Sequence, residues 1–231
     1  MRTVLNKLTS TPLKRYLFVV SVIIILVLLV AYIGSFYSSW RENQLIAQYL
    51  NDPQKSFFAE LLRRDQKDLA SNPERARRIG ITMDMGLQWY GLAEYDLAVK
   101  WWRRGLSIEP NNDIGWYNLG NAYRELRQYP NAENAYKESM EVSTPGEIDA
   151  CLALGEMYRY AYTYKKDKEP DVYLECLEKH KQDRDLIARL AIYYRDVGDK
   201  PNAIKYFDQL WSIDPTQDVS EELRKLGLQD E

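Results

Sequence analysis

The sequence repeats itself with a period of 34 residues. Three pairs of positions share this spacing: Gly86 and Gly120, Ala98 and Ala132, and Trp102 and Tyr136. A period of this size is typical of chains built from one small helical unit that cannot bury its apolar face alone. Such units must stack on one another. We therefore expect a solenoid over residues 79–215 rather than a globule with a single central core.

The repeated residues resemble the tetratricopeptide repeat. Its signature places Trp, then Leu-Gly, then Tyr on a first helix, and Ala, an aromatic and a small residue on a second helix. The unit at 113–146 carries nearly the whole set: Trp116, Leu119, Gly120, Tyr123, Ala132, Tyr136 and Ser139. The resemblance implies an all-α fold, in which about four helix-turn-helix repeats form a right-handed superhelix.

We predict four units, at about 79–112, 113–146, 148–183 and 184–217. The third departs from the pattern. Its first helix has Leu154, Gly155 and Tyr158, but its second helix must come from residues 170–182, where Tyr173 and Cys176 are the nearest fits. The third and fourth units begin 36 residues apart, at 148 and 184, instead of the usual 34. This difference indicates a two-residue insertion in the turn before Pro170.

The segments that flank the repeats are also predicted to be helical. Residues 218–226 read as a final capping helix, followed by a tail to residue 231, because Asp218 suits an N-cap and Gly227 a stop. Residues 38–78 form either a cap packed on the repeats or a stalk. Phe57 and Phe58 favour packing, since a stalk would leave an apolar stripe in water.

An uncharged apolar segment precedes the repeats. Residues 16–37 read YLFVVSVIIILVLLVAYIGSFY, which is 22 residues against the roughly 20 that a helix needs to cross a bilayer. The apolar core of a cleaved signal peptide is shorter, so we predict an uncleaved transmembrane signal anchor. Residues 1–15 hold four basic residues and no acid. The positive-inside rule then puts this tail in the cytoplasm and the repeats outside the membrane, which is most simply a bacterial inner membrane.

Composition argues against catalysis and against nucleic-acid binding. The chain has one histidine, two cysteines and a net charge of −3, and it lacks a phosphate loop, an HExxH motif and a CxxC motif. We therefore predict no enzyme, no cofactor, no metal and no nucleic-acid partner. His180 is the single histidine, and it falls at the end of a predicted helix, where we expect it to be solvated.

The resemblance implies a concave groove, lined by the first helices, that binds a segment of a partner protein. Carried over by position, the groove residues are Met83, Leu87, Tyr90, Tyr117, Asn121, Arg124, Leu152, Glu156, Arg159, Ile192 and Arg195. Its N-terminal half is apolar and its arginines form a row. This suits a peptide with an apolar anchor and acidic groups. Alternatively, each arginine pairs with a neighbouring acid such as Glu125, Glu156 or Asp196.

The two cysteines fall within one predicted unit. Cys151 and Cys176 fall on the two helices of the third unit, at levels that a hairpin brings together. They either form a disulfide, which an extracytoplasmic location allows, or remain two buried thiols.

Trp101 and Trp102 are adjacent on one helix. We expect Trp101 to be exposed, where it could contact a second copy or the membrane.

These observations favour a membrane-anchored scaffold or adaptor. It would bind a partner segment in its groove as a component of a bacterial cell-envelope complex. The alternative is a docking receptor for client proteins with inverted topology, in which the same groove faces the cytosol.

Overall fold

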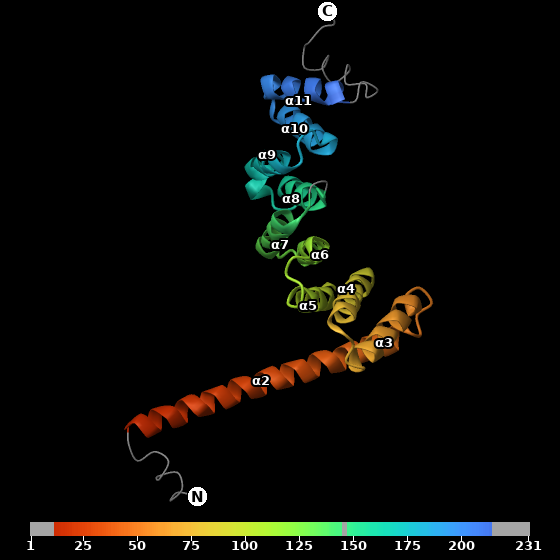
Figure 1. Ribbon diagram of the computed structural model, residues 1–231, viewed down its shortest axis with the longest axis vertical. Coiled ribbons are helices and arrows are strands. Elements are labelled where there is room, and N and C mark those ends of the chain that lie inside the picture. The colour runs from red at the N-terminus through yellow and green to blue at the C-terminus, as the bar shows by residue number, and fades with distance from the viewer. Residues whose placement is uncertain (1–11, 145–146, 214–231) are drawn as a thin grey trace, which may run out of the picture. The chain divides into compact units, whose positions relative to one another are not determined.

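The computed structural model describes residues 12–144 and 147–213, which form ten α-helices, one short 3-10 helix and no strand (Figure 1). The helices are α2 (Pro12–Tyr49), α3 (Ser56–Ala70), α4 (Arg75–Gly91), α5 (Tyr95–Leu106), α6 (Asp113–Glu125), α7 (Tyr129–Val142), α8 (Asp149–Tyr160), η1 (Thr163–Lys168), α9 (Glu169–Lys179), α10 (Arg184–Val197) and α11 (Lys200–Ile213). The predicted all-helical fold is confirmed. The predicted capping helix at 218–226 and residues 1–11 of the basic tail lie outside the described residues.

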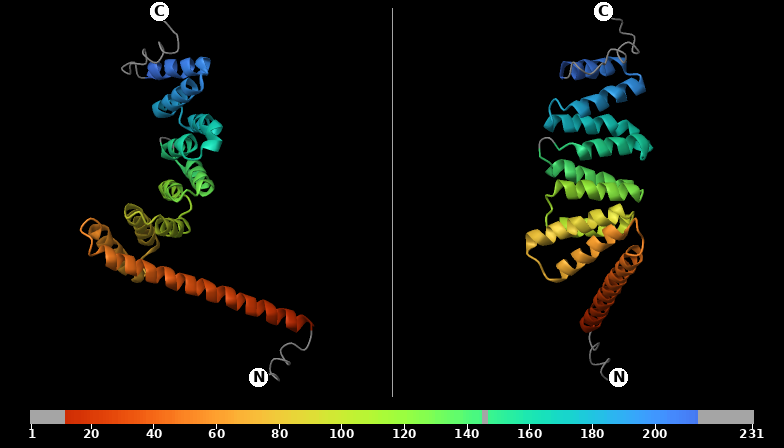
Figure 2. Two further views of the ribbon diagram at one scale, coloured as in Figure 1. Left: turned by 180° about the vertical axis from the view of Figure 1, so that it is seen from behind. Right: turned by 90° about the vertical axis from the view of Figure 1, so that its right-hand side faces the viewer.

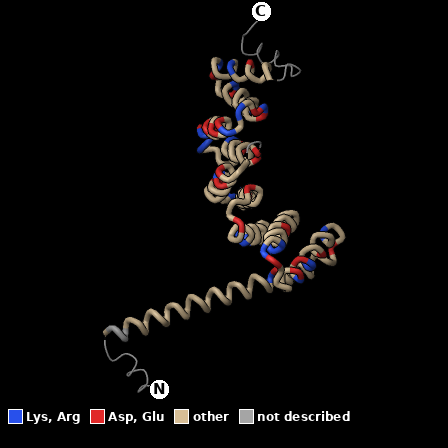
Figure 3. The backbone as a smooth tube through the Cα atoms, viewed as in Figure 1, with Lys and Arg blue, Asp and Glu red and all other residues tan. Residues whose placement is uncertain are grey.

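The chain divides into two compact units, the first ending at Arg63. Helix α2 dominates the first unit. It is one continuous helix of 38 residues, and it is free of charged residues over most of its length (Figure 3). Its stretch from Tyr16 to Tyr49 is long and apolar enough to cross a membrane. Helix α2 does not end with the apolar stretch at residue 37 but continues to Tyr49, where Ile46 and Tyr49 are buried.

The second unit is a stack of helical hairpins (Figure 2). Helices adjacent in the chain from α4 to α11 pack on one another, and the first helices of successive hairpins also touch, α4 with α6 and α6 with α8. Local signals fix the helix ends. The Asn112 side chain accepts a hydrogen bond from the Gly115 N–H at 2.7 Å and caps α6. Gly198 ends α10 in the left-handed region, with φ of 78°.

An aromatic ring lies against a glycine in three of the hairpins. Trp102 covers Gly86, Tyr136 covers Gly120 and Tyr173 covers Gly155. A Cβ atom on Gly120 would come within 2.6 Å of the Tyr136 ring, so the close approach requires glycine. Tyr173 follows its glycine by 18 positions, whereas the other two rings follow by 16. The extra residues are accommodated by η1 before α9 begins.

The prediction that Trp101 is exposed was wrong. Its side chain is only 4% exposed, and Trp102 is buried as well. The residue before the aromatic ring is buried in all four hairpins, as Trp101, Ala135, Val172 and Tyr206. Adjacent helix positions are about 100° apart, so one faces the first helix of its own hairpin and the other can be covered by a different neighbour. Both tryptophans therefore belong to the core, and Trp101 offers no surface for self-association.

Replacing Gly120 with alanine should destabilise the protein. The added methyl group meets the Tyr136 ring, and overpacking of this kind costs about 1–3 kcal/mol. Gly80 is the matched control: it also lies inside a helix, but nothing stands within 4 Å of a Cβ placed there. Gly80→Ala should leave stability unchanged or raise it by up to about 1 kcal/mol. Urea unfolding followed by circular dichroism measures both, and equal effects would contradict the assigned contact.

Candidate functional site

The predicted groove residues lie on α4, α6, α8 and α10, the first helices of the four hairpins. Leu87 is 56% exposed, and the other ten are partly exposed. None of them is buried, so the first helices present a continuous set of accessible side chains.

A tyrosine cluster forms the N-terminal half of this surface. The Tyr136 hydroxyl donates a hydrogen bond to Asn121 Oδ1 at 2.8 Å. The Tyr117 ring lies 6.3 Å from the Tyr136 ring, and the Tyr90 ring lies 5.7 Å from the Trp102 ring, between centroids. Burial raises the pKa of Tyr90 and of Tyr136. Both hydroxyls are therefore even less acidic than an ordinary tyrosine; that of Tyr136 already donates to Asn121, and that of Tyr90 can donate a hydrogen bond.

Arg124 is the cation of this cluster. Its nearest acid is its chain neighbour, Glu125, at 3.6 Å between Nη2 and Oε1, and its side chain is 32% exposed. Burial lowers its pKa, but interaction with Tyr136, then Glu125 and Tyr90, outweighs burial and raises the pKa. A long pair between partly exposed groups contributes little stability. The guanidinium can therefore exchange Glu125 for a carboxylate of a bound segment.

Arg159 has a different role. Its Nε donates to both carboxylate oxygens of Glu169, at 2.8 and 3.0 Å, and its Nη1 lies 3.3 Å from Asp196 Oδ2. The side chain of Arg159 is 10% exposed and that of Glu169 is 1% exposed. Burial raises the pKa of Glu169, and the hydrogen bond from Arg159 opposes that rise. This ion pair joins α8 to the start of α9, and it leaves Arg159 little freedom to bind a ligand.

The remaining charged groove residues are also paired. Arg195 Nη2 lies 2.9 Å from Asp196 Oδ1, and Glu156 Oε1 lies 2.6 Å from Arg189 Nη2. The arginines thus follow the pairing alternative, although Arg159 takes Glu169 as its main partner. Sequence reasoning missed Glu169, because it lies ten residues further on, beyond η1, and no local pattern marks it.

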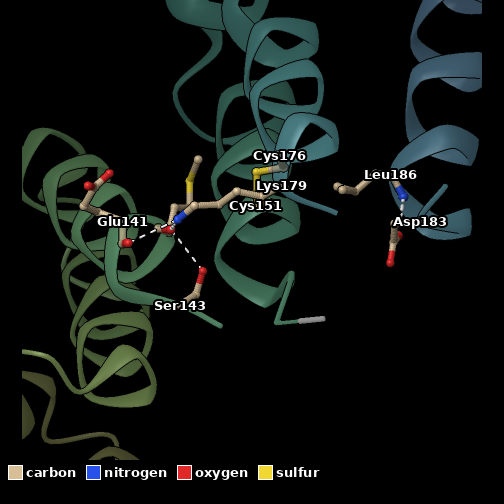
Figure 4. Close-up of a disulfide and its surroundings, with 8 residues drawn as sticks. Glu141, Ser143, Cys151, Cys176, Lys179, Asp183 and Leu186 are labelled. Atoms are coloured by element: carbon tan, nitrogen blue, oxygen red, sulfur yellow. Dashed lines mark hydrogen bonds between the residues drawn. A yellow bond between two sulfur atoms is a disulfide. The ribbon is translucent and has the colours of Figure 1, made fainter. Parts of the chain in front are cut away.

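The sulfur atoms of Cys151 and Cys176 form a disulfide that joins α8 to α9, with the Cα atoms 6.3 Å apart (Figure 4). Lys179 on α9 donates to the carbonyl oxygens of Met140 and Glu141, at 2.6 and 3.1 Å. The expectation that His180 is solvated was wrong, since it is 7% exposed. It lines a small cavity with the two cysteines, because the chain turns just after α9 and holds the imidazole against the hairpin.

Comparison with known proteins identifies the fold family. The tetratricopeptide repeat model matches residues 101–134, which run from α5 to α7. The match confirms the predicted tetratricopeptide repeat over these residues. The chain is 35% identical over 86 residues to the Homo sapiens Superkiller complex protein 3, a match that spans 37% of this chain and 5% of that protein.

Among solved structures, the tetratricopeptide stack is similar to two crystal structures of MamA. The first is 18% identical with a TM-score of 0.55, over 74% of this chain and 94% of that chain. The second is 17% identical with a TM-score of 0.54, over 82% of this chain and 99% of that chain. At this identity the likeness concerns the fold alone.

Replacing Arg159 with methionine should strongly destabilise the protein. The substitution leaves the buried carboxylate of Glu169 without its partner, which costs about 3–5 kcal/mol. The double variant Arg159→Met/Glu169→Met should regain much of that loss, because it removes both charges. Arg195→Met is the control, and its partly exposed pair should contribute less than about 1 kcal/mol. Urea unfolding of the four proteins gives the comparison, and equal effects of the two single substitutions would refute a structural role for Arg159.

Proposed function

We propose that this protein is a non-catalytic, membrane-anchored scaffold that binds a segment of a partner protein on its first helices. The binding surface is the tyrosine cluster of α4 and α6, made of Tyr90, Tyr117, Asn121 and Arg124, with the exposed Leu87 beside it on α4. Apolar and aromatic side chains supply contact area there, and a few polar groups fix orientation, as in known peptide sites.

The observation that carries the proposal is the state of Arg124. It is a partly exposed cation beside tyrosines, and its one acidic neighbour stands 3.6 Å away. By contrast, Arg159 is buried in an ion pair. We infer a ligand segment with an apolar or aromatic side chain followed by a carboxylate, from an acidic residue or a chain terminus, that binds the N-terminal half of the groove.

The proposed location is a bacterial cell envelope, with residues 16–37 in the membrane and the repeats on the outer side. The basic N-terminal tail supports this orientation. The disulfide supports it too, because disulfides persist in oxidising compartments and are rare in the cytosol. The same groove facing the cytosol, as a docking receptor, is the competing arrangement.

Binding can be tested with a random peptide library displayed with free carboxyl termini and selected on the full-length protein in nanodiscs. We expect enrichment of peptides that combine an aromatic or aliphatic residue with a carboxylate. Arg124→Ala should weaken the selected peptides at least tenfold, in line with the about 1.5–3 kcal/mol of a hydrogen bond to a charged group. Arg195→Ala, with the same side-chain exposure of 32%, should change affinity less than twofold. Equal losses in both variants would contradict the assignment to Arg124.

Topology can be tested with a C-terminal tag and protease applied to spheroplasts. We expect cleavage without permeabilisation of the inner membrane. Protection until permeabilisation would instead support the cytosol-facing receptor.

The disulfide between Cys151 and Cys176 can be tested separately by labelling of thiols. Protein denatured without a reductant should not react with maleimide, because both cysteines are bridged. Reduction should then add two labels. It should also lower the free energy of unfolding by about 3 kcal/mol, the chain-entropy value for a loop of this length. Labelling before reduction would show free thiols and remove the support that the disulfide gives to the extracytoplasmic location.

A further inference from the structure

A second groove lies between α5 and α7, the second helices of two successive hairpins. Its cavity volume is about 590 Å³, and its floor is α6. The floor residues Trp116, Leu119 and Tyr123 lie on a different face of α6 from the groove residues Tyr117 and Arg124. The volume lies within the range of known ligand sites, which are about 300–1,000 Å³.

The floor is an apolar stripe that runs along the axis of α6. Trp116, Leu119 and Tyr123 are separated by three and four positions, so they line up over about 10 Å on one helix face. Leu119 is buried, and the two aromatic side chains are half-buried. The indole N–H of Trp116 donates to the carbonyl oxygen of Pro110 at 2.7 Å, which holds the ring in place. The groove is therefore preformed.

The corresponding groove in the next hairpin is crossed by side chains. Between α7 and α9, Lys165 Nζ lies 2.6 Å from Glu133 Oε2 toward one end. Toward the other end Lys179 Nζ donates to the Met140 carbonyl oxygen at 2.6 Å. These bonds occupy Glu133, Lys165 and Lys179, although a cavity of about 620 Å³ remains beside them. Burial raises the pKa of Glu133, but hydrogen bonds from Lys165 and Lys137 outweigh burial and lower it, so this carboxylate stays charged.

Three polar side chains on the walls of the α5–α7 groove are without a partner in the described residues. Arg103 stands on α5, and Asn134 and Glu138 stand on α7. Within the part of the chain that the structure describes, none of these three side chains makes a hydrogen bond or an ion pair. The groove thus combines an apolar floor with a cation on one wall and an anion on the other.

We propose that this groove binds an amphipathic helix of a partner protein, with its apolar stripe on the floor. One edge of that helix carries acidic residues that face Arg103, and the other carries basic residues that face Glu138. A helix is favoured because it satisfies its own backbone hydrogen bonds, whereas an extended segment would lay unpaired N–H and C=O groups on apolar rings. The site is independent of the tyrosine cluster, so the scaffold could hold two partners at once.

The probes are three synthetic helical peptides with the same leucine stripe. One has glutamates on one edge and lysines on the other, and the two controls carry lysines or glutamates on both edges. Binding of each labelled peptide to the full-length protein in nanodiscs is measured by fluorescence anisotropy, with empty nanodiscs subtracted. The mixed peptide should bind at least fivefold more tightly than either control.

Charge reversal on each wall gives the decisive comparison. Arg103→Glu makes both walls acidic and should shift the preference to the peptide with two lysine edges. Glu138→Lys makes both walls basic and should shift it to the peptide with two glutamate edges. Both residues are exposed, so the variants should fold. A preference that neither reversal changes would overturn the proposal, as would no binding of any peptide.

Two further variants separate the two grooves. Asn134→Trp places a bulky ring in the cavity from an exposed wall position and should weaken the mixed peptide at least tenfold. Arg124→Ala, in the tyrosine cluster, should change its affinity less than twofold. The reverse result would assign helix binding to the concave surface and overturn the α5–α7 site while leaving the proposed function in place.

Discussion

The contact between a flat aromatic ring and a bare glycine backbone sets the distance between paired helices. Trp102, Tyr136 and Tyr173 each use it, and each ring is fully buried. With a methyl group in the way, the two helices of a hairpin would have to separate, and the interface to the next hairpin would move with them. Because a solenoid is a sum of nearest-neighbour interfaces, this local geometry propagates along the stack.

The repeated packing residues made the all-helical fold predictable from the sequence, because side chains such as Gly120 and Tyr136 recur at a fixed spacing. The wrong predictions have a common physical origin. Trp101 and His180 were judged from a single helix, but their burial depends on neighbouring elements. The Glu169 carboxylate could not be paired with Arg159 from sequence, because the intervening η1 follows no repeat. The repeat pattern predicts the packing contacts that all the repeats share, but it does not predict a contact that occurs in one repeat alone, such as the Arg159–Glu169 pair.

The same residue type has three different environments at equivalent positions of successive repeats. Arg124 keeps a long contact with a neighbouring acid, Arg159 is buried against Glu169, and Arg195 pairs with the next residue in the chain. The difference arises from the second helices, since that of the third hairpin places the buried carboxylate of Glu169 within hydrogen-bond distance of its arginine. This ion pair and the disulfide both join the two helices of the third hairpin.

Helix α2 has a mechanical consequence. It runs from Pro12 to Tyr49 without a break, a length of about 57 Å at the usual rise per residue. No glycine-proline joint or loop separates the apolar stretch from the buried residues Ile46 and Tyr49. A twist applied to the apolar end is therefore transmitted as torque to those two residues. Within the first unit, the apolar stretch and the buried end of α2 therefore turn together as one rigid helix.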